Sequence, residues 1–257
     1  MKLEDRIKSY ETIATQGYLL PRIPIVARID FRGFSKFTKS LVKPYDERLS
    51  KLMIETAKYL VEKNDALIAY TQSDEITLVF KYDTVEDMPF RGRIFKITSL
   101  LAAQASGFFN KKMAEYLPEK NNIIVECDCR PFNVPTDMEA YNALLLRERD
   151  ATKNAISMAA DAYYSHKELK GKNGNEKQEM LFQKGVNFND YPSMFKRGSY
   201  IKKVKIELEY TEAQLAKMKK KPESKTYIRN RIDRLELEPI VTIQSEMLEI
   251  IFGKDVE

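Results

Sequence analysis

The chain has 257 residues, 43% hydrophobic and 32% charged, which is typical of a globular protein and not of a disordered, collagen-like or coiled-coil chain. This length predicts one large domain or two small ones, and no apolar run is long enough for a transmembrane helix. Its net charge is +5. Two cysteines only two residues apart and an N-terminus without an apolar segment favour a reducing compartment, expected to be the cytoplasm, with no membrane partner.

Hydrophobic periodicity divides the first half of the chain into alternating strands and helices. The segment 23–30 is apolar on both faces, as in a buried central strand. The predicted elements are a helix at 3–13, a strand at 23–30, a helix at 46–63, a strand hairpin at 66–70 and 75–81, a long helix between Pro89 and about Tyr116, and a strand at 122–129.

The order strand-helix-strand-strand-helix-strand is that of a split βαβ unit. It predicts an α+β fold with a ferredoxin-like, polymerase-palm core, in which an antiparallel sheet carries two helices on one face. We assign residues 1–200 to this domain, with helical insertions, and 201–257 to a C-terminal extension.

The second half of the chain is less regular. Thr136 and Glu139 form a capping box that opens a helix extending past Asp161. Polar residues and three glycines at 168–190 predict a loop or lid, and 200–210 predicts a strand. A basic helix or helical hairpin is expected from there to about residue 237.

Basic residues are concentrated near the C-terminus. Residues 196–234 hold 13 Lys and Arg against 5 Asp and Glu, a local charge of +8, so the remainder carries −3. A basic extension suits a polyanion such as RNA, although a solvated helical face would have the same composition. We expect the run Lys219, Lys220 and Lys221 to contact RNA.

Carboxylates fall where the predicted topology brings chain segments together. Asp30 ends the first strand, and Asp74 and Glu75 lie at the hairpin tip beside it. Carboxylates this close need a cation or a shared proton, and hard oxygen ligands suit Mg²⁺. Ordinary turn residues would give the same pattern. The single histidine, His166, excludes a Ser/His/Asp triad elsewhere in the chain.

The chain has no glycine-rich phosphate loop. Phosphate groups would have to be bound by basic side chains, for which Lys43, Arg93 and Lys96 are candidates. Arg93 and Lys96 share a face at the start of the long helix.

Several motifs in order resemble the tRNA-histidine guanylyltransferase family, and most closely its bacterial and archaeal guanylyltransferase-like 3′–5′ polymerases. The resemblance covers about residues 20–200. It rests on ARIDFRGFSKFTK (27–39), KPYDERLSKLM (43–53), AYTQSDEITLVF (69–80), FRGRIFK (90–96), ECDCRPFNVPT (126–136), LRERDATKNAI (146–156) and GVNFNDYPSMFKRG (185–198).

The resemblance implies two Mg²⁺ ions, ATP or GTP as activating nucleotide and substrate, tRNA as partner, and a homo-oligomer, specifically a tetramer. It implies that Asp30 and Asp74 are metal ligands together with the Phe31 carbonyl, and that Glu75 supports the catalytic site. The remaining residues that it implies are Arg32, Gly33, Phe34, Ser35, Lys43, Asp46 and Ser73 for a nucleotide pocket, and Arg93, Lys96, Lys177 and Asn187 for the triphosphate or RNA 5′ end.

Two activities within this family stay open. Thr152 stands where eukaryotic members carry the histidine of a His-Ile-Asn-Asn motif. This favours template-dependent repair of 5′-truncated tRNA over dedicated guanylation of histidine tRNA. Outside the family, a nucleotidyl cyclase and a non-catalytic RNA-binding protein are the alternatives.

Overall fold

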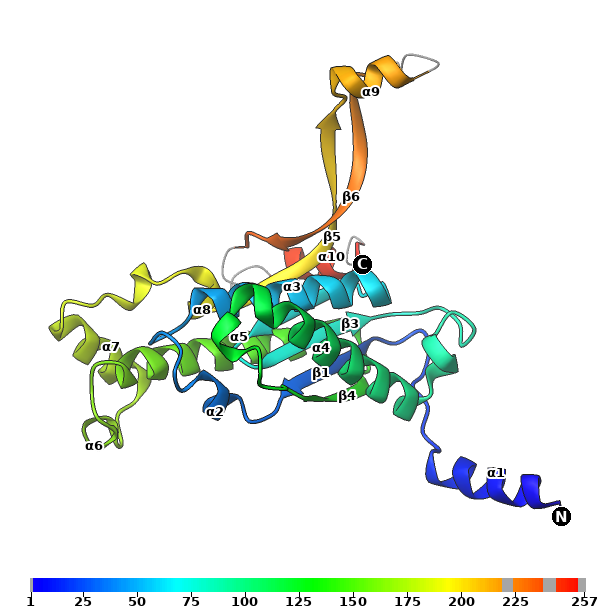
Figure 1. The fold of residues 1–257 in the computed structure, drawn as a ribbon, viewed down its shortest axis with the longest axis horizontal. Helices are drawn as coiled ribbons and strands as arrows, with labels where there is room; N and C mark the ends of the chain where they lie inside the picture. Colours follow the sequence, from blue (N-terminus) through cyan, green and yellow to red (C-terminus); the bar gives the residue numbers. More distant parts are fainter. Residues whose placement is uncertain (1, 219–223, 238–243, 254–257) are drawn as a thin grey trace.

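The computed structural model describes residues 2–218, 224–237 and 244–253 of the chain (Figure 1). The strands are β1 (Ile25–Phe31), β2 (Ile68–Gln72), β3 (Glu75–Phe80), β4 (Cys127–Asn133), β5 (Ser199–Glu209) and β6 (Thr226–Leu235). The α-helices are α1 (Leu3–Ala14), α2 (Phe34–Thr38), α3 (Glu47–Asn64), α4 (Ile94–Tyr116), α5 (Asp137–Asp161), α6 (His166–Leu169), α7 (Gly174–Gln183), α8 (Ser193–Lys196), α9 (Glu212–Lys217) and α10 (Gln244–Phe252). Short 3₁₀ helices are η1 (Pro89–Gly92), η2 (Pro118–Lys120) and η3 (Phe188–Asp190).

Within the described residues, six strands form one antiparallel sheet in the order β4-β1-β3-β2-β5-β6. The first four strands have the predicted split βαβ arrangement, which confirms the α+β fold. In the register, Asp30 of β1 lies opposite Glu75 of β3 and opposite Asp128 of β4. Directly opposed residues share a face of the sheet, so these three acidic side chains form one row.

Helices cover both faces of this sheet. Ala27 and Ile29 of β1 belong to a core cluster with residues of α3 and α4. Val26 packs on the opposite face, in a cluster with Leu144 of α5 and Leu248 of α10. The sequence placed helices on one face only; α5 and α10 cover the other, as the doubly apolar β1 requires.

The predicted loop at 168–190 is wrong. This segment contains α6, α7 and η3, and Leu169, Leu181 and Phe188 are buried in a third core cluster. Helix α7 begins with a reciprocal capping box between Asn173 and Glu176. The prediction failed because α7 is short and mostly polar, and only Leu181 of this helix is buried.

The predicted basic helix after β5 is also wrong. β5 and β6 form a two-stranded ribbon that projects from the body, with α9 near its outer end (Figure 1). Along β5, half-buried residues alternate with exposed ones, which is the period of a strand. The predicted domain boundary at residue 200 falls inside β5, and the strand predicted at 122–129 begins only at Cys127.

The base of this ribbon, here called the arm, is held against α3. Lys58 lies 3.5 Å from Asp233, and Lys203 lies 2.7 Å from Asp65. Ile232 packs against the core cluster beneath α3 and α4. An isolated two-stranded ribbon is marginally stable in water, so these contacts anchor the arm. Among the described residues, no helix is both long and apolar enough to cross a bilayer.

Candidate active site at one end of the sheet

Two acidic residues meet where β1 ends and the β2–β3 hairpin turns. The Phe31 backbone N–H donates to the Asp74 carbonyl oxygen at 2.9 Å, which ties the turn to the end of β1. Burial, and secondarily the Asp30 charge, raise the pKa of Asp74 above its usual value. The structure thus brings together Asp30 and Asp74, as the sequence pattern predicted.

The turn itself contains an unfavourable backbone conformation. Ser73 and Asp74 connect β2 and β3, and Ser73 has a φ of 53°. A residue with a Cβ pays about 1–2 kcal/mol in this left-handed region. The Ser73 side chain hydrogen-bonds Asp74, so the strained residue also helps to orient the carboxylate.

Arginines balance the acidic row behind the turn. Glu75 Oε2 lies 3.4 Å from Arg147 Nη1 on α5 and 3.8 Å from Arg28 Nε on β1. Burial raises the pKa of Glu75, and the two arginines oppose that rise. Asp128 forms an ion pair with Arg130 at 3.2 Å.

The sequence analysis quoted the motifs that contain Arg28, Asp128 and Arg130 but gave these three residues no role in the site. Their positions could have been found by counting every second residue along β1 and β4, because alternate strand residues share a face.

The donors at this end of the sheet fit Mg²⁺. Asp30 and Asp74 offer two carboxylates, and Phe31 offers a backbone carbonyl at the end of β1. The Phe31 ring is buried against Phe109, with ring centroids 4.9 Å apart, which fixes this backbone. Mg²⁺ typically takes one or two carboxylates and keeps several waters. In the described part of the chain, no group of three or more His, Cys, Asp or Glu side chains could hold a metal ion.

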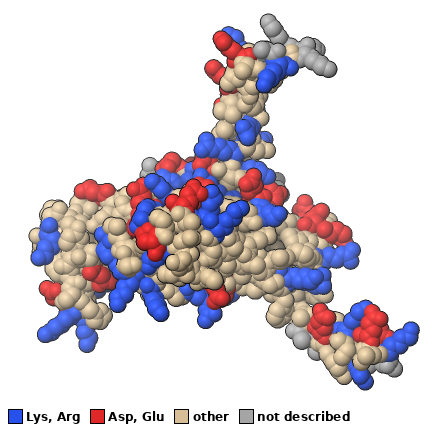
Figure 2. Space-filling model, in the orientation of Figure 1, with Lys and Arg blue, Asp and Glu red and all other residues tan. Residues whose placement is uncertain are grey.

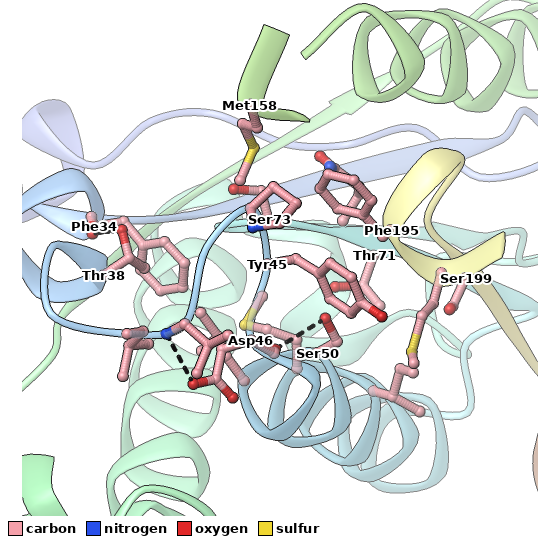
Figure 3. Close-up of a pocket in the computed structure, with 18 of the residues that line it drawn as sticks. Phe34, Thr38, Tyr45, Asp46, Ser50, Thr71, Ser73, Met158, Phe195 and Ser199 are labelled. Carbon is pink, nitrogen blue, oxygen red and sulfur yellow. Dashed lines mark hydrogen bonds between the residues drawn. The ribbon is translucent and has the colours of Figure 1, made fainter. Parts of the chain in front are cut away.

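A cavity of about 80 Å³ adjoins Ser73 (Figure 3). Its walls are largely apolar, and the rings of Tyr45 and Phe195 stack with centroids 4.7 Å apart. Four of the residues predicted for a nucleotide pocket line the cavity, namely Phe34, Lys43, Asp46 and Ser73. The other three, Arg32, Gly33 and Ser35, are exposed beside it.

Comparisons with known proteins agree with this geometry. The family model of tRNAHis guanylyltransferase matches residues 4–135, and that of the Thg1 C terminal domain matches residues 155–242. The chain is 33% identical over 205 residues to tRNA(His) guanylyltransferase of Saccharomyces cerevisiae, covering 73% of this chain and 85% of the relative. The chain belongs to the tRNAHis guanylyltransferase family.

Solved structures support the same assignment. A bacterial tRNA(His) guanylyltransferase-like protein in complex with ATP aligns with a TM-score of 0.80 and 30% identity, covering 98% of this chain and 100% of that chain. A structure described in the same words but in complex with GTP gives a TM-score of 0.75 and 29% identity. The crystal structure of the Saccharomyces cerevisiae enzyme gives 0.66 and covers 74% of this chain. As a family member, the chain is a nucleotidyltransferase.

Asp46, one of the residues predicted to bind the nucleotide, already forms hydrogen bonds with Arg48 of the protein. Asp46 caps α3 by accepting from the Arg48 backbone N–H at 3.0 Å, and its carboxylate also accepts from Arg48 Nε and Nη2 at 3.0 and 2.8 Å. The hydrogen bonds from the Arg48 side chain are the main cause that lowers the Asp46 pKa. The carboxylate therefore stabilises the cavity wall.

Two further predicted residues lie far from the carboxylates in the same chain. Arg93 and Lys96 lie at the start of α4, whereas Phe31 contacts Phe109. At 1.5 Å per residue, the start of the helix is roughly 24 Å from Phe109. The structure therefore does not unite Arg93 and Lys96 with Asp30 within one chain.

The remaining predicted contacts are divided between the cavity and the surface. Lys177 Nζ donates to Ser157 Oγ at 3.0 Å, next to Met158 in the cavity wall. Asn187 is exposed and caps η3 by accepting from the Asn189 backbone N–H at 3.0 Å. The run at 219–221 lies outside the described residues.

Proposed function

We propose that this chain adds nucleotides to the 5′ end of tRNA in the 3′–5′ direction, directed by the opposing strand, and so repairs 5′-truncated tRNA. The observation that carries this proposal is the meeting of Asp30 and Asp74 beside an aromatic cavity with Lys43 at its rim. Activation of the RNA end by ATP or GTP would precede nucleotide transfer.

Each part of the site has a role in this reaction. The cavity walls, including Tyr45 and Phe195, would hold the base of a nucleotide, and the exposed Lys43 would attract its phosphates. Asp30, Asp74 and the Phe31 carbonyl would hold two Mg²⁺. When bound, the ions would help to activate the attacking hydroxyl and neutralise charge on the pyrophosphate that leaves.

The arm supplies a surface for the RNA. A groove of about 750 Å³ at its base is lined by four basic and two acidic side chains, beside the stacked rings of Tyr59 and Phe108. The basic residues are Lys58, Lys203, Arg229 and Arg231, and the acidic residues are Glu55 and Glu62 of α3. On the face in Figure 2, basic and acidic side chains are mixed over the arm and body. RNA affinity would therefore depend on local arginines and lysines more than on one large basic patch.

Two observations favour repair over dedicated guanylation. Thr152 replaces the histidine that eukaryotic members carry, and the bacterial structure in complex with ATP aligns over 98% of this chain, arm included. Guanylation of histidine tRNA is the second candidate. It is favoured by the names of curated relatives, such as the probable tRNA(His) guanylyltransferase of Dictyostelium discoideum, 30% identical over 230 residues.

The test uses 5′-monophosphorylated tRNA shortened by one nucleotide, with ATP, all four nucleoside triphosphates and Mg²⁺. Sequencing of the products should show guanosine added opposite C, and uridine opposite A when the opposing nucleotide is changed. Guanosine added whatever nucleotide lies opposite would identify histidine-tRNA guanylation. A cyclic nucleotide product would indicate a cyclase, and no product an RNA-binding protein.

The catalytic role of the carboxylates is tested separately. Asp30→Asn and Asp74→Asn should each abolish nucleotide addition while tRNA binding survives, because the loss of a metal ligand removes charge stabilisation in the transition state. Near-normal turnover by either variant would refute the ligand assignment. Homo-oligomer formation and a cytoplasmic location stay predictions for the intact protein.

A further inference from the structure

Ser199 has an unused hydrogen-bonding group at the edge of the cavity. This first residue of β5 is only 4% exposed, and its Oγ is one of two buried side-chain atoms of the described residues that make no hydrogen bond. Ser199 lies opposite Thr71 of β2, so both side chains face the same side of the sheet. Figure 3 shows both residues around the cavity with Tyr45 and Phe195.

Three other hydroxyl groups of the cavity already donate their protons to the protein. Thr38 Oγ1 donates to the Phe34 carbonyl at 3.0 Å, and Thr71 Oγ1 donates to the Glu75 carbonyl at 2.9 Å. Ser50 Oγ is placed to donate to the Asp46 carbonyl at 3.4 Å. Buried polar groups in native proteins are nearly always paired, so a buried hydroxyl without a partner calls for an explanation.

The surroundings of Ser199 fit the edge of a heteroaromatic ring. The walls of the cavity expose more apolar than polar surface, and the aromatic and methionine side chains among them suit a flat ring. Its volume of about 80 Å³ accommodates several water-sized groups. The hydroxyl of serine both donates and accepts, so it can pair with either an amino group or a carbonyl group on that ring.

We propose that Ser199 Oγ hydrogen-bonds the substituent at position 6 of a purine base held in this cavity. It accepts from the amino group of adenine and donates to the carbonyl of guanine, so the cavity takes a purine nucleoside triphosphate of either kind. This inference rests on the proposed function, because it assigns the base of the activating nucleotide to the cavity.

The test measures equilibrium binding of ATP, GTP and purine riboside triphosphate, which lacks the substituent at position 6, to the full chain without RNA. The wild type should bind ATP and GTP about tenfold more tightly than purine riboside triphosphate, the effect of about one net hydrogen bond. Ser199→Ala should bind all three within about twofold. Its affinity for purine riboside triphosphate should equal that of the wild type.

Ser50→Ala is the matched control, because it removes a hydroxyl from the same cavity that already has a protein partner. This variant should keep the wild-type preference. Equal binding of the three nucleotides by the wild type, or a preference that survives in Ser199→Ala, would overturn the inference and leave the proposed function intact. If the wild type binds none of the nucleotides, both fail. A thermal unfolding curve confirms that each variant is folded.

Discussion

Asp46 lines the cavity, and its carboxylate could either stabilise the fold or contact a nucleotide. Mutation of this residue can separate the two roles. The residue is 6% exposed, caps α3 and forms a two-point ion pair with the guanidinium of Arg48, which is half exposed. The Val42 N–H adds a longer contact at 3.4 Å. These bonds predict that the carboxylate mainly stabilises the fold.

The magnitude follows from the number and exposure of these bonds. Removal of an N-cap costs about 1 kcal/mol of stability. A charge pair with one half-exposed partner adds about 1 kcal/mol, at the upper end for solvent-exposed pairs. Asp46→Ala should therefore lose about 2 kcal/mol in the free energy of unfolding. Asp46→Asn should lose about half of that, because asparagine is also a good N-cap.

Denaturant unfolding at several pH values separates the contribution of the Asp46 charge to stability from the contribution of its N-cap hydrogen bond. Because the pKa of Asp46 is lower in the folded state than in the unfolded state, its charge stabilises the protein fully above pH about 4. That stabilisation is lost as pH falls through the folded pKa. The difference in stability between wild type and Asp46→Asn should therefore be constant near neutral pH and disappear in acid.

Two results would refute this reasoning. The first is equal destabilisation by Asp46→Ala and Asp46→Asn, with no dependence on pH. The second is loss of nucleotide addition in a fully folded Asp46→Asn variant, which would show that the carboxylate contacts the nucleotide as the family pattern implies.

Two further predictions concern the hairpin turn and the arm. Ser73→Gly should raise the free energy of unfolding by about 1 kcal/mol, because glycine adopts the left-handed φ of this position without strain. The same variant should slow single-turnover nucleotide addition, because Asp74 loses the hydrogen bond from the Ser73 side chain. An unchanged rate of addition would refute this role of Ser73. The double substitution Arg229→Ala and Arg231→Ala should weaken tRNA binding and reduce its salt dependence by about 0.9 per lost phosphate contact. Lys205→Ala, on the other face of the arm, is the control, and an equal effect there would assign the binding to overall charge.

The central fold could be predicted because its signals are local. The apolar stripe of α3, from Leu49 to Leu60, and the alternation of Ile76, Leu78 and Phe80 are buried as expected. The polar stretch at 168–190 misled because α7 contributes only Leu181 as a fully buried residue. The periodicity of so short a helix is weaker than the loop signal of the glycines and lysines in the stretch 168–190.

The candidate site was predictable only where topology determined it. Asp30 and Asp74 meet because a split βαβ unit makes their strands neighbours. The aromatic cavity was not predictable, since Tyr45 and Phe195 come from segments whose packing depends on tertiary contacts. The spacing of Arg93 and Lys96 correctly predicted that they share a face of the helix. It carried no information on how far along the helix they lie from Asp30 and Asp74.

One continuous strand joins the cavity to the outer part of the arm. β5 begins at Ser199 in the cavity wall and ends at Glu209, with β6 paired along its length. Side chains alternate between faces, so loss of a single residue would turn the rest of the ribbon inside out. The reach of the arm can therefore change only in steps of two residues on each strand, roughly 6.6 Å at a time. Insertions or deletions in this ribbon should thus be tolerated only as matched pairs, and each would lengthen or shorten the arm by that step.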